Sequence, residues 1–274
     1  TIAGLENALI NLDCNRKGVN SVSYIMGQSL ESTISNGIVI GDVSMDELLG
    51  IVEQHVANGC KRIKLKVSPR DGYERTRLVR DAYPELALAV DANQSYTYDQ
   101  LDMVAAYNDL NLLCIEEPFS MMNLTTYKAW KESLPNWPIT TSICLDESIL
   151  SYDDLSYAIE YRLIDVLNVK VGRLGGLIQT RAAILRCREA GIPYWIGSMV
   201  ESGISKILHV QLAALGDTCM AGDLSDSSRY FEHDLINPEI SFTDGSMQVP
   251  NGAGLGVDVL DNRIEEYTVE KRTL

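Results

Sequence analysis

Five short apolar segments of the chain each end in a charged residue, and these charged residues follow one another at intervals of 24 to 30 residues. A parallel strand with its return helix takes up such an interval, so the spacing predicts repeated strand–helix units. In eight-stranded barrels built from such units, catalytic groups lie at the C-terminal ends of the strands. The spacing therefore predicts that five side chains meet at one mouth: Lys66, Asp91, Glu116, Asp146 and Lys170.

Three of these strand-end residues are acids, and their convergence is unfavourable without a cation. Carboxylates that share a site repel one another and raise one another's pKa. Ligation by oxygen alone suits magnesium or manganese rather than zinc, and His55, His209 and His233 do not lie at such strand ends. A single aspartate before a loop is often a helix cap or a turn residue. Three acids at matching strand ends favour a metal site instead.

The segment RIKLKV at residues 62–67 alternates basic and apolar side chains. Successive side chains of a strand point to opposite faces, so Arg62, Lys64 and Lys66 share one face. On an amphipathic surface strand these side chains would lie in solvent. In a barrel, helices cover the outer face of the strand, so the basic face points into the barrel interior. The ordinary pKa of lysine is about 10.4, and nearby cations lower it, so Lys64 and a metal would make Lys66 a usable base. Together with Lys170, such a site predicts removal of a proton α to a carboxylate.

Strand and helix signals alternate from residue 36 to residue 225. Capping boxes of Ser44 with Glu47, and of Thr97 with Gln100, mark two helix starts. The series ends with TCMAGDLS at residues 218–225, which we interpret as an eighth strand. Eight strands with seven or eight helices favour a closed barrel, and an open doubly wound sheet is the alternative.

Both ends of the chain lie outside this alternation. Residues 1–30 predict one or two helices, and residues 238–260 predict a hairpin with Asp244 and Gly245 at its turn. We expect both segments to form a second layer against the barrel.

The composition argues against several classes of partner. A net charge of −15 repels phosphate backbones and anionic lipids, so we expect no nucleic acid and no membrane partner. An anionic small-molecule substrate stays compatible, because surface charges are screened beyond about 8 to 10 Å. No apolar stretch approaches the ~20 residues that cross a bilayer. The six cysteines are far apart, as is typical of reduced thiols, and we expect a cytoplasmic protein.

Several motifs together resemble the muconate-lactonizing subgroup of the enolase superfamily. They contain the five strand-end residues: K-L-K at 64–66, D-A-N at 91–93, E-E-P at 116–118, D-E-S at 146–148 and N-V-K-V-G-R-L-G-G at 168–176. Three further segments are similar to the o-succinylbenzoate synthase and N-acylamino acid racemase branch of Gram-positive bacteria: G-S-M-V-E-S-G-I-S at 197–205, A-G-D-L-S-D-S-S-R-Y-F at 221–231 and V-P-N-G-A-G-L-G-V at 249–257. The resemblance covers nearly the whole chain.

The resemblance implies roles for the matching residues. Asp91, Glu116 and Asp146 would be ligands of Mg²⁺, with Mn²⁺ as the alternative ion. Lys66 would be the acid/base on one face of the substrate, and Lys170 its counterpart on the other.

The resemblance also implies which residues contact the substrate and which support the metal ligands. Lys64 would bind the substrate carboxylate and lower the pKa of Lys66, and Ser198 and Met199 would line the substrate side. Glu117, where relatives carry glutamine, would support the metal ligands from behind.

The resemblance also implies a fold, a TIM-type (β/α)7β barrel with remnants of an N-terminal α+β capping domain. The barrel would span residues 31–225. Residues 1–30 would be the residual C-terminal part of the cap, most of which is absent from the sequence, and residues 226–274 would pack back on the barrel or cap.

The implied activity is that of a magnesium-dependent carbon–oxygen lyase acting on a small-molecule carboxylate. Dehydration to o-succinylbenzoate in menaquinone biosynthesis is the first interpretation. Racemisation of N-acylamino acids such as N-succinylamino acids is the alternative, because the same lysines and acids serve both reactions. A non-catalytic truncated barrel is a third interpretation, for which the missing cap is the evidence. A homo-oligomer is compatible with the sequence, which does not decide the oligomeric state.

Overall fold

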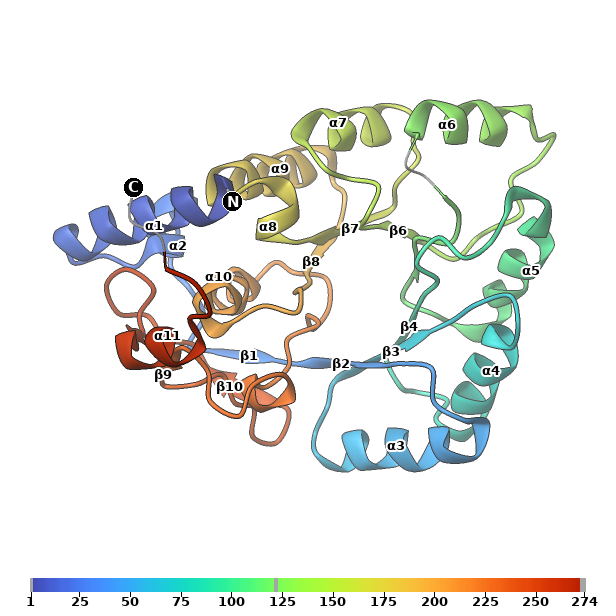
Figure 1. Ribbon diagram of the computed structural model, residues 1–274. Coiled ribbons are helices and arrows are strands. Elements are labelled where there is room, and N and C mark those ends of the chain that lie inside the picture. Colours follow the sequence, from blue (N-terminus) through green and yellow to red (C-terminus); the bar gives the residue numbers. More distant parts are fainter. Residues whose placement is uncertain (1, 121–122, 272–274) are drawn as a thin grey trace.

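The computed structural model describes residues 2–120 and 123–271, and its central element is a parallel sheet. Seven strands of this described part pair in sequence order, each parallel to the next. They are β2 (Gly37–Ile40), β3 (Arg62–Lys66), β4 (Leu88–Asp91), β5 (Ile115–Glu116), β6 (Ile143–Leu145), β7 (Val166–Val169) and β8 (Tyr194–Ile196). Figure 1 shows helices on the outer side of the curved sheet. The chain therefore has an α/β fold in which a parallel sheet is curled into a half-barrel.

The helices follow the strands in the predicted alternation. They are α3 (Met45–Ala57), α4 (Gly72–Ala82), α5 (Leu101–Ala105), α6 (Leu124–Ser133), α7 (Tyr152–Glu160), α8 (Val171–Leu174), α9 (Leu177–Ala190) and α10 (Gly203–Ala213), with 3₁₀ turns η1 (Tyr98–Gln100), η2 (Ala106–Leu110) and η3 (Ser227–Arg229). Both predicted capping boxes are present, at the start of α3 and of η1. A box at each position provides acceptors for backbone N–H groups that the first turn leaves free.

The segment predicted as the eighth strand, residues 218–225, is not a regular strand, and that prediction is wrong in this form. It makes a single parallel bridge, between Gly222 and Asn36. Three backbone hydrogen bonds join it to the two edges of the sheet: Cys219 N to Tyr194 O (2.9 Å), Asp223 N to Ile196 O (3.2 Å) and Gly37 N to Gly222 O (2.7 Å). A Cβ at Gly222 would lie 2.3 Å from Ile196 O. The segment passes so close to β8 that only glycine fits at this point.

The alternation predicted for β3 is confirmed. Arg62 and Lys64 are 1% and 2% exposed, and the charged groups of both lie 4.9 Å from the Trp195 ring centroid. Ile63 and Leu65 are fully buried in the main hydrophobic cluster. The basic face of β3 therefore points into the curled sheet, toward the indole of β8, and not into solvent.

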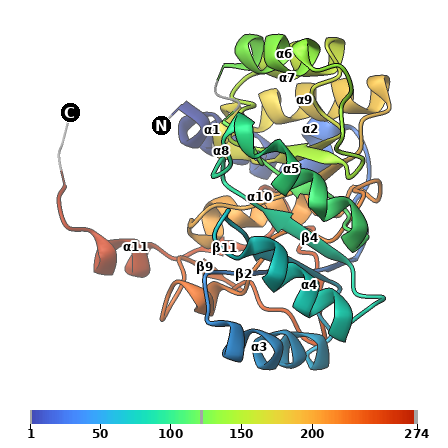
Figure 2. The same ribbon diagram turned by 90° about the vertical axis from the view of Figure 1, so that its right-hand side faces the viewer.

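The two ends of the chain pack beside the sheet. Helices α1 (Ile2–Lys17) and α2 (Ser21–Met26) contact α8, α9 and α10, and they confirm the helices predicted for this region. Two short antiparallel pairs connect distant segments: β1 (Thr33–Ser35) with β10 (Ser246–Gln248), and β9 (Ile236–Asn237) with β11 (Asp258–Val259). The last helix, α11 (Asp261–Tyr267), extends away from the body of the molecule in Figure 2.

The hairpin predicted within residues 238–260 is only partly present. Asp244 and Gly245 have φ angles of +50° and +69° and form the expected turn, next to a bridge between Thr243 and Ser246. The strand after the turn, β10, pairs along its length with β1, and the Thr243–Ser246 bridge is its one pairing with the segment before the turn in the described chain. Local turn chemistry could not indicate this partner, because β1 lies at the other end of the chain.

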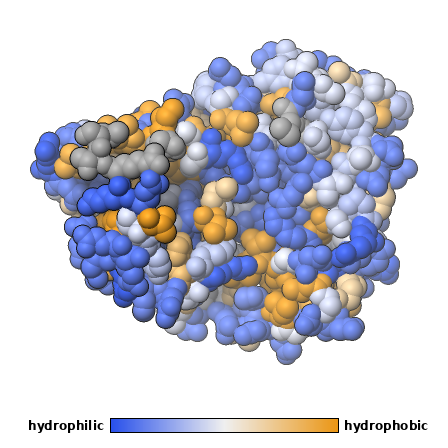
Figure 3. Space-filling view, in the orientation of Figure 1, coloured by the Kyte–Doolittle hydropathy of each residue, from blue (hydrophilic) through white to orange (hydrophobic). Residues whose placement is uncertain are grey.

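The surface agrees with the composition. Figure 3 shows a face dominated by hydrophilic residues, as expected for a net charge of −15. Among the described helices, none is long and apolar enough to cross a membrane.

Candidate functional site

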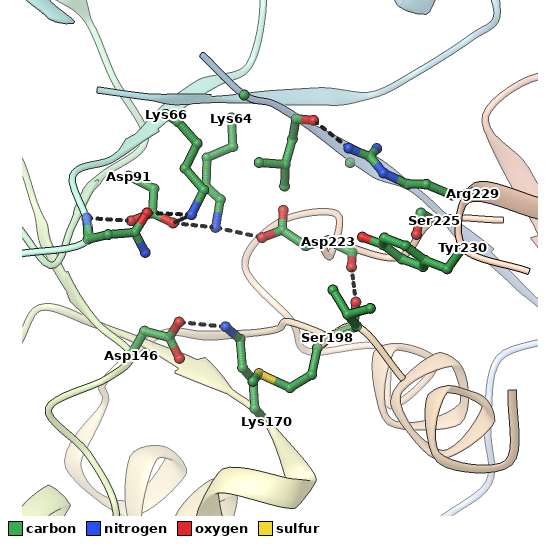
Figure 4. Close-up of a pocket in the computed structure, with 16 residues that line it drawn as sticks. Lys64, Lys66, Asp91, Asp146, Lys170, Ser198, Asp223, Ser225, Arg229 and Tyr230 are labelled. Atoms are coloured by element: carbon green, nitrogen blue, oxygen red, sulfur yellow. Dashed lines mark hydrogen bonds and ion pairs between the residues drawn. The ribbon is translucent and has the colours of Figure 1, made fainter. Parts of the chain in front are cut away.

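A pocket of about 340 Å³ opens at the C-terminal ends of the strands (Figure 4). Seven of the eight predicted site residues line it: Lys64, Lys66, Asp91, Asp146, Lys170, Ser198 and Met199. The eighth, Glu116, is fully buried and is joined to the pocket by its ion pair with Lys64. The structure therefore brings the predicted residues together at one place.

One side of the pocket is formed by the ends of β3 and β4. Lys66 and Asp91 are register partners in these parallel strands, and Lys66 Nζ donates to Asp91 Oδ2 at 2.6 Å. The same ammonium donates to Asn93 Oδ1 at 2.6 Å, and the backbone N of Asn93 donates to Asp91 Oδ1 at 2.9 Å. Adjacent strands with matching register thus position the base candidate directly beside its carboxylate.

The opposite side is formed by the ends of β6 and β7. Lys170 directly follows β7 at the start of α8, and its Nζ donates to Asp146 Oδ2 at 2.6 Å. Arg173, one turn further along α8, forms a second ion pair with Asp146. Gly197 makes room for this arrangement, because a Cβ there would lie 2.8 Å from Lys170 Cε. The same Cβ would lie 2.2 Å from Asn168 Oδ1, so the glycine after β8 leaves space for both side chains.

Between these sides, Lys64 connects three carboxylates. Its Nζ lies 2.7 Å from Glu116, 3.3 Å from Asp91 and 2.6 Å from Asp223. Burial opposes the charge of this lysine, but the carboxylates, Asp223 first, outweigh burial and raise its pKa well above the ordinary value. Lys64 therefore keeps a fixed positive charge beneath Lys66.

Sequence analysis missed Asp223, which lines the same pocket. Burial works against its charge, but Lys64 and Arg62 lower its pKa below the usual range. Asp223 lies inside the segment that was interpreted as an eighth strand, whereas the other acids close their strands. Had that strand been ended at Asp223, the rule of strand-end charges would have found it.

Two of the three predicted metal ligands, Asp91 and Asp146, line the pocket, and Glu116 lies buried beside it, but the three do not form a ready coordination cluster. Asp91 and Glu116 bracket Lys64 Nζ at 3.3 and 2.7 Å. Within residues 2–120 and 123–271, no three or more His, Cys, Asp and Glu side chains are close enough together to hold a metal. Their chemistry nevertheless fits a hard divalent cation, because all three are buried carboxylates at successive strands. Asp146 Oδ1 is buried without a hydrogen-bond partner among the described residues, and the ion pairs with Lys170 and Arg173 balance the charge of this carboxylate.

Glu117 lies behind Asp146, where the resemblance implied a supporting role. Its Oε1 accepts hydrogen bonds from the backbone N of Asp146 at 2.8 Å and of Ser148 at 2.7 Å. Its Oε2 accepts from Ser148 Oγ at 2.8 Å. Burial raises the pKa of Glu117 to about 8, although the hydrogen bonds from Ser148 act in the other direction. This carboxyl group therefore shapes the loop that presents Asp146.

Known proteins resemble this chain over most of its length. Residues 47–263 match the family described as Enolase C-terminal domain-like. An o-succinylbenzoate synthase from Geobacillus kaustophilus is 36% identical over 267 residues, which cover 97% of this chain and 69% of that protein. An N-succinylamino acid racemase from Thermus thermophilus is 36% identical over 245 residues, which cover 89% of this chain and 64% of that protein.

Solved structures have the same fold. An enolase superfamily member from Enterococcus faecalis matches with a TM-score of 0.89 at 30% identity, over 97% of this chain and 70% of that one. A muconate lactonizing enzyme from Pseudomonas fluorescens matches with a TM-score of 0.86 at 18% identity, over 97% of this chain and 72% of that one, which shows the fold alone. The family match and the relatives at 36% identity together show that this chain belongs to the enolase superfamily, as its motifs predicted.

Proposed function

We propose that the protein is a magnesium-dependent lyase that removes a proton α to a carboxylate and forms o-succinylbenzoate by dehydration, a step of menaquinone biosynthesis. One observation carries the proposal: two lysines face the same pocket from opposite sides, each 2.6 Å from an aspartate at a strand end. Relatives named o-succinylbenzoate synthase at 36% and 35% identity support the reaction.

Asp91, Glu116 and Asp146 would hold the magnesium ion, or manganese in its place. When bound, the metal supplies positive charge that holds the substrate carboxylate and stabilises the enediolate. The carboxylates are buried, and within the described chain their charges are now balanced by lysine and arginine. A crystal structure grown with magnesium should place oxygens of all three within about 2.0 to 2.6 Å of one ion. A ligand set that leaves out one of these acids would contradict the assignment.

The remaining roles belong to the chain's own side chains. Lys66 would take the α-proton of the cyclohexadiene carboxylate and return it to the departing hydroxyl, so that a C–H and a C–O bond break and water leaves. Lys170 would stabilise the enediolate from the opposite side as a cation. Lys64 would hold the substrate carboxylate by its fixed charge, and Ser198 and Met199 would line the substrate side.

The same proposal covers the finer architecture. Residues 31–225 would form a (β/α)7β barrel, closed by the backbone bonds of residues 219–223 to both edges of the sheet. Residues 1–30 would correspond to the C-terminal part of a capping domain, because α1 and α2 lie outside the sheet against α8, α9 and α10. Residues 226–274 would pack back on the barrel, as the pairing of β10 with β1 supports.

Racemisation of N-succinylamino acids is the second candidate. A racemase must exchange protons on both faces of the α-carbon, and a lysine on each side of the pocket meets that need. The relative from Thermus thermophilus carries this activity in its name.

The test measures both reactions on one preparation of the full-length protein. Turnover of the hydroxycyclohexadiene carboxylate that dehydrates to o-succinylbenzoate, and of an N-succinylamino acid, is followed with magnesium and with a chelator. We expect magnesium-dependent dehydration. Racemisation alone would favour the second candidate, and no turnover of either compound would leave the non-catalytic barrel as the better interpretation.

A further inference from the structure

The pocket extends beyond the lysine pairs to a second end. This end is lined by Ser225, the last residue of the segment 218–225, by Arg229 and Tyr230 after it, and by Val39 of β2 and Gly41 directly after β2. Figure 4 shows Arg229 and Tyr230 on the far side of the pocket from Lys66, Asp91 and Asp146, with Asp223 between the two ends. One ligand could therefore touch both ends at once.

Arg229 differs from the other cations of the pocket. Lys64, Lys66 and Lys170 each form ion pairs with strand-end acids, whereas Arg229 forms none with any residue that the structure describes. Its Nη2 donates to Val39 O at 3.2 Å, which uses one of five N–H donors. Arg229 is exposed at this end of the pocket, and in a chain of net charge −15 a cation without an ion-pair partner among the described residues would attract an anionic ligand.

A buried hydroxyl group beside Arg229 supports the same conclusion. Ser225 is 8% exposed, lines the pocket, and its Oγ has no hydrogen-bond partner in the described chain. A buried donor without a partner is costly, and an anion at this end of the pocket would lower that cost.

We propose that Ser225, Arg229 and Tyr230 form a carboxylate subsite that binds the second carboxylate of a dicarboxylate substrate. This inference rests on the proposed function, in which the first carboxylate is held near Lys64. Both candidate substrates of that function carry a succinyl tail that ends in a carboxylate. The planar guanidinium of Arg229 matches a carboxylate with two parallel hydrogen bonds, and hydroxyl groups of Ser225 and Tyr230 supply further donors.

The experiment measures binding without turnover. Dissociation constants are determined by calorimetry on the full-length protein with magnesium, for o-succinylbenzoate and for 2-butyrylbenzoate, in which a methyl group replaces the tail carboxylate. Wild type should prefer the dicarboxylate. Arg229→Gln should weaken binding of o-succinylbenzoate about 10- to 100-fold, as expected for lost charged hydrogen bonds, and leave 2-butyrylbenzoate unchanged.

Three further variants make the result specific. Arg229→Lys should restore part of the preference, because it keeps the charge without the planar fork. Ser225→Ala should weaken binding of the dicarboxylate only. If Arg229→Gln does not fold, Ser225→Ala and Arg229→Lys together provide the test. Arg77→Gln, the same change of charge on the outer helix α4, should bind both ligands as wild type does.

Each contrary outcome has its own meaning. Equal weakening of both ligands by Arg229→Gln would overturn the subsite and make Arg229 a structural contact to Val39. Equal affinity of wild type for both ligands would also overturn it. If wild type binds neither ligand but is folded, the proposed function itself fails, and the subsite with it.

Discussion

The pocket contains two lysine–aspartate pairs of equal length that differ in how they are held. Lys66 with Asp91 and Lys170 with Asp146 both span 2.6 Å. The side chain of Lys66 is 37% exposed, whereas that of Lys170 is 11% exposed. The two sides of the pocket therefore carry the same chemical groups in different surroundings.

Local contacts hold the Lys66 side. The neighbouring strands β3 and β4 set its register, and Asn93, two residues after Asp91, supplies the remaining partner. Asn93 in turn donates to Glu147 Oε1 at 2.9 Å, beyond the end of β6.

Long-range buried contacts hold the Lys170 side. The backbone N of Val171 donates to His209 Nε2 of α10 at 3.0 Å, and His209 is fully buried. His209 Nδ1 lies 3.2 Å from Glu201 Oε1, outside good hydrogen-bond geometry, and the same oxygen accepts from the backbone N of Met199 at 3.0 Å. The comparison indicates that Lys66 has freedom to carry a proton, while Lys170 is fixed to its loop and helix.

The largest effect should come from the open side. Lys66→Ala should lower turnover by about 10²- to 10⁴-fold, the range for a positioned general base, because the α-proton then has no acceptor. The measurement is steady-state kcat with magnesium, together with a thermal melt to show that folding is intact. Lys61→Ala removes an exposed lysine just before the same strand and serves as the matched control. Near-normal turnover of Lys66→Ala would remove this lysine from the mechanism.

Lys170→Arg should separate the roles of the two sides. Arginine keeps the positive charge but does not release a proton near neutral pH, so it can stabilise the enediolate without acting as an acid/base. We expect the variant to keep more of its dehydration rate than of any racemisation rate. Both rates are measured on one preparation, with solvent deuterium exchange at the α-carbon of each amino acid enantiomer. Equal losses in the two rates, or unchanged exchange for both enantiomers, would show that Lys170 is not the acid/base of the second face.

A smaller effect should follow from loosening the support of Lys170. His209→Leu keeps a side chain of similar volume but leaves the Val171 N–H without an acceptor. We expect turnover to fall about 10-fold, because Lys170 is then misplaced. His209→Gln retains an acceptor near the position of Nε2 and should recover most of the loss. The readout is kcat against KM for each variant, with melting temperatures for both. If both variants lose turnover only in proportion to folded protein, His209 has no positioning role.

The contrast between the two sides also explains what the sequence could predict. Lys66, Asp91, Glu116, Asp146 and Lys170 were found because each closes an apolar strand, and strand period and spacing are local signals. Parallel pairing then brings such ends together without further information.

The second end of the pocket and the support of Lys170 depend on contacts between distant segments, which no local sequence pattern predicts. Arg229 and Ser225 join the pocket only because residues 218–225 run beside β2 and β8 with a single bridge in place of a regular ladder. His209 was notable in the sequence only for lying away from the strand ends, and its contact with Val171 N depends on how α10 lies against the start of α8. The fold class was thus accessible from the sequence, and so was the set of strand-end charges. The second end of the pocket and the support of Lys170 were not.

The smallest effect on activity should come from Glu117, which supports the Asp146 loop from behind. In Glu117→Gln the amide oxygen can still accept from the backbone N of Asp146 and of Ser148, and the amide nitrogen can donate to Ser148 Oγ. We expect turnover close to that of wild type. A loss of more than about 10-fold would show that the negative charge of Glu117 is needed on the Lys170 side.

Stability of the same variant should depend on pH in a defined direction. Burial raises the pKa of Glu117 from 4.5 to about 8, so the folded protein binds more protons at this group than the unfolded protein does between those values. The free energy of unfolding therefore falls as pH rises through that interval, and the loss is complete above the folded pKa. Glutamine does not titrate, so Glu117→Gln should gain stability relative to wild type between about pH 5 and about pH 9. Melting temperatures across this range test the sign, with Glu53→Gln on the exposed side of α3 as control. A difference that stays constant with pH would show that Glu117 is ionised throughout, and that the loop behind Asp146 is held by a charge and not by a neutral acid.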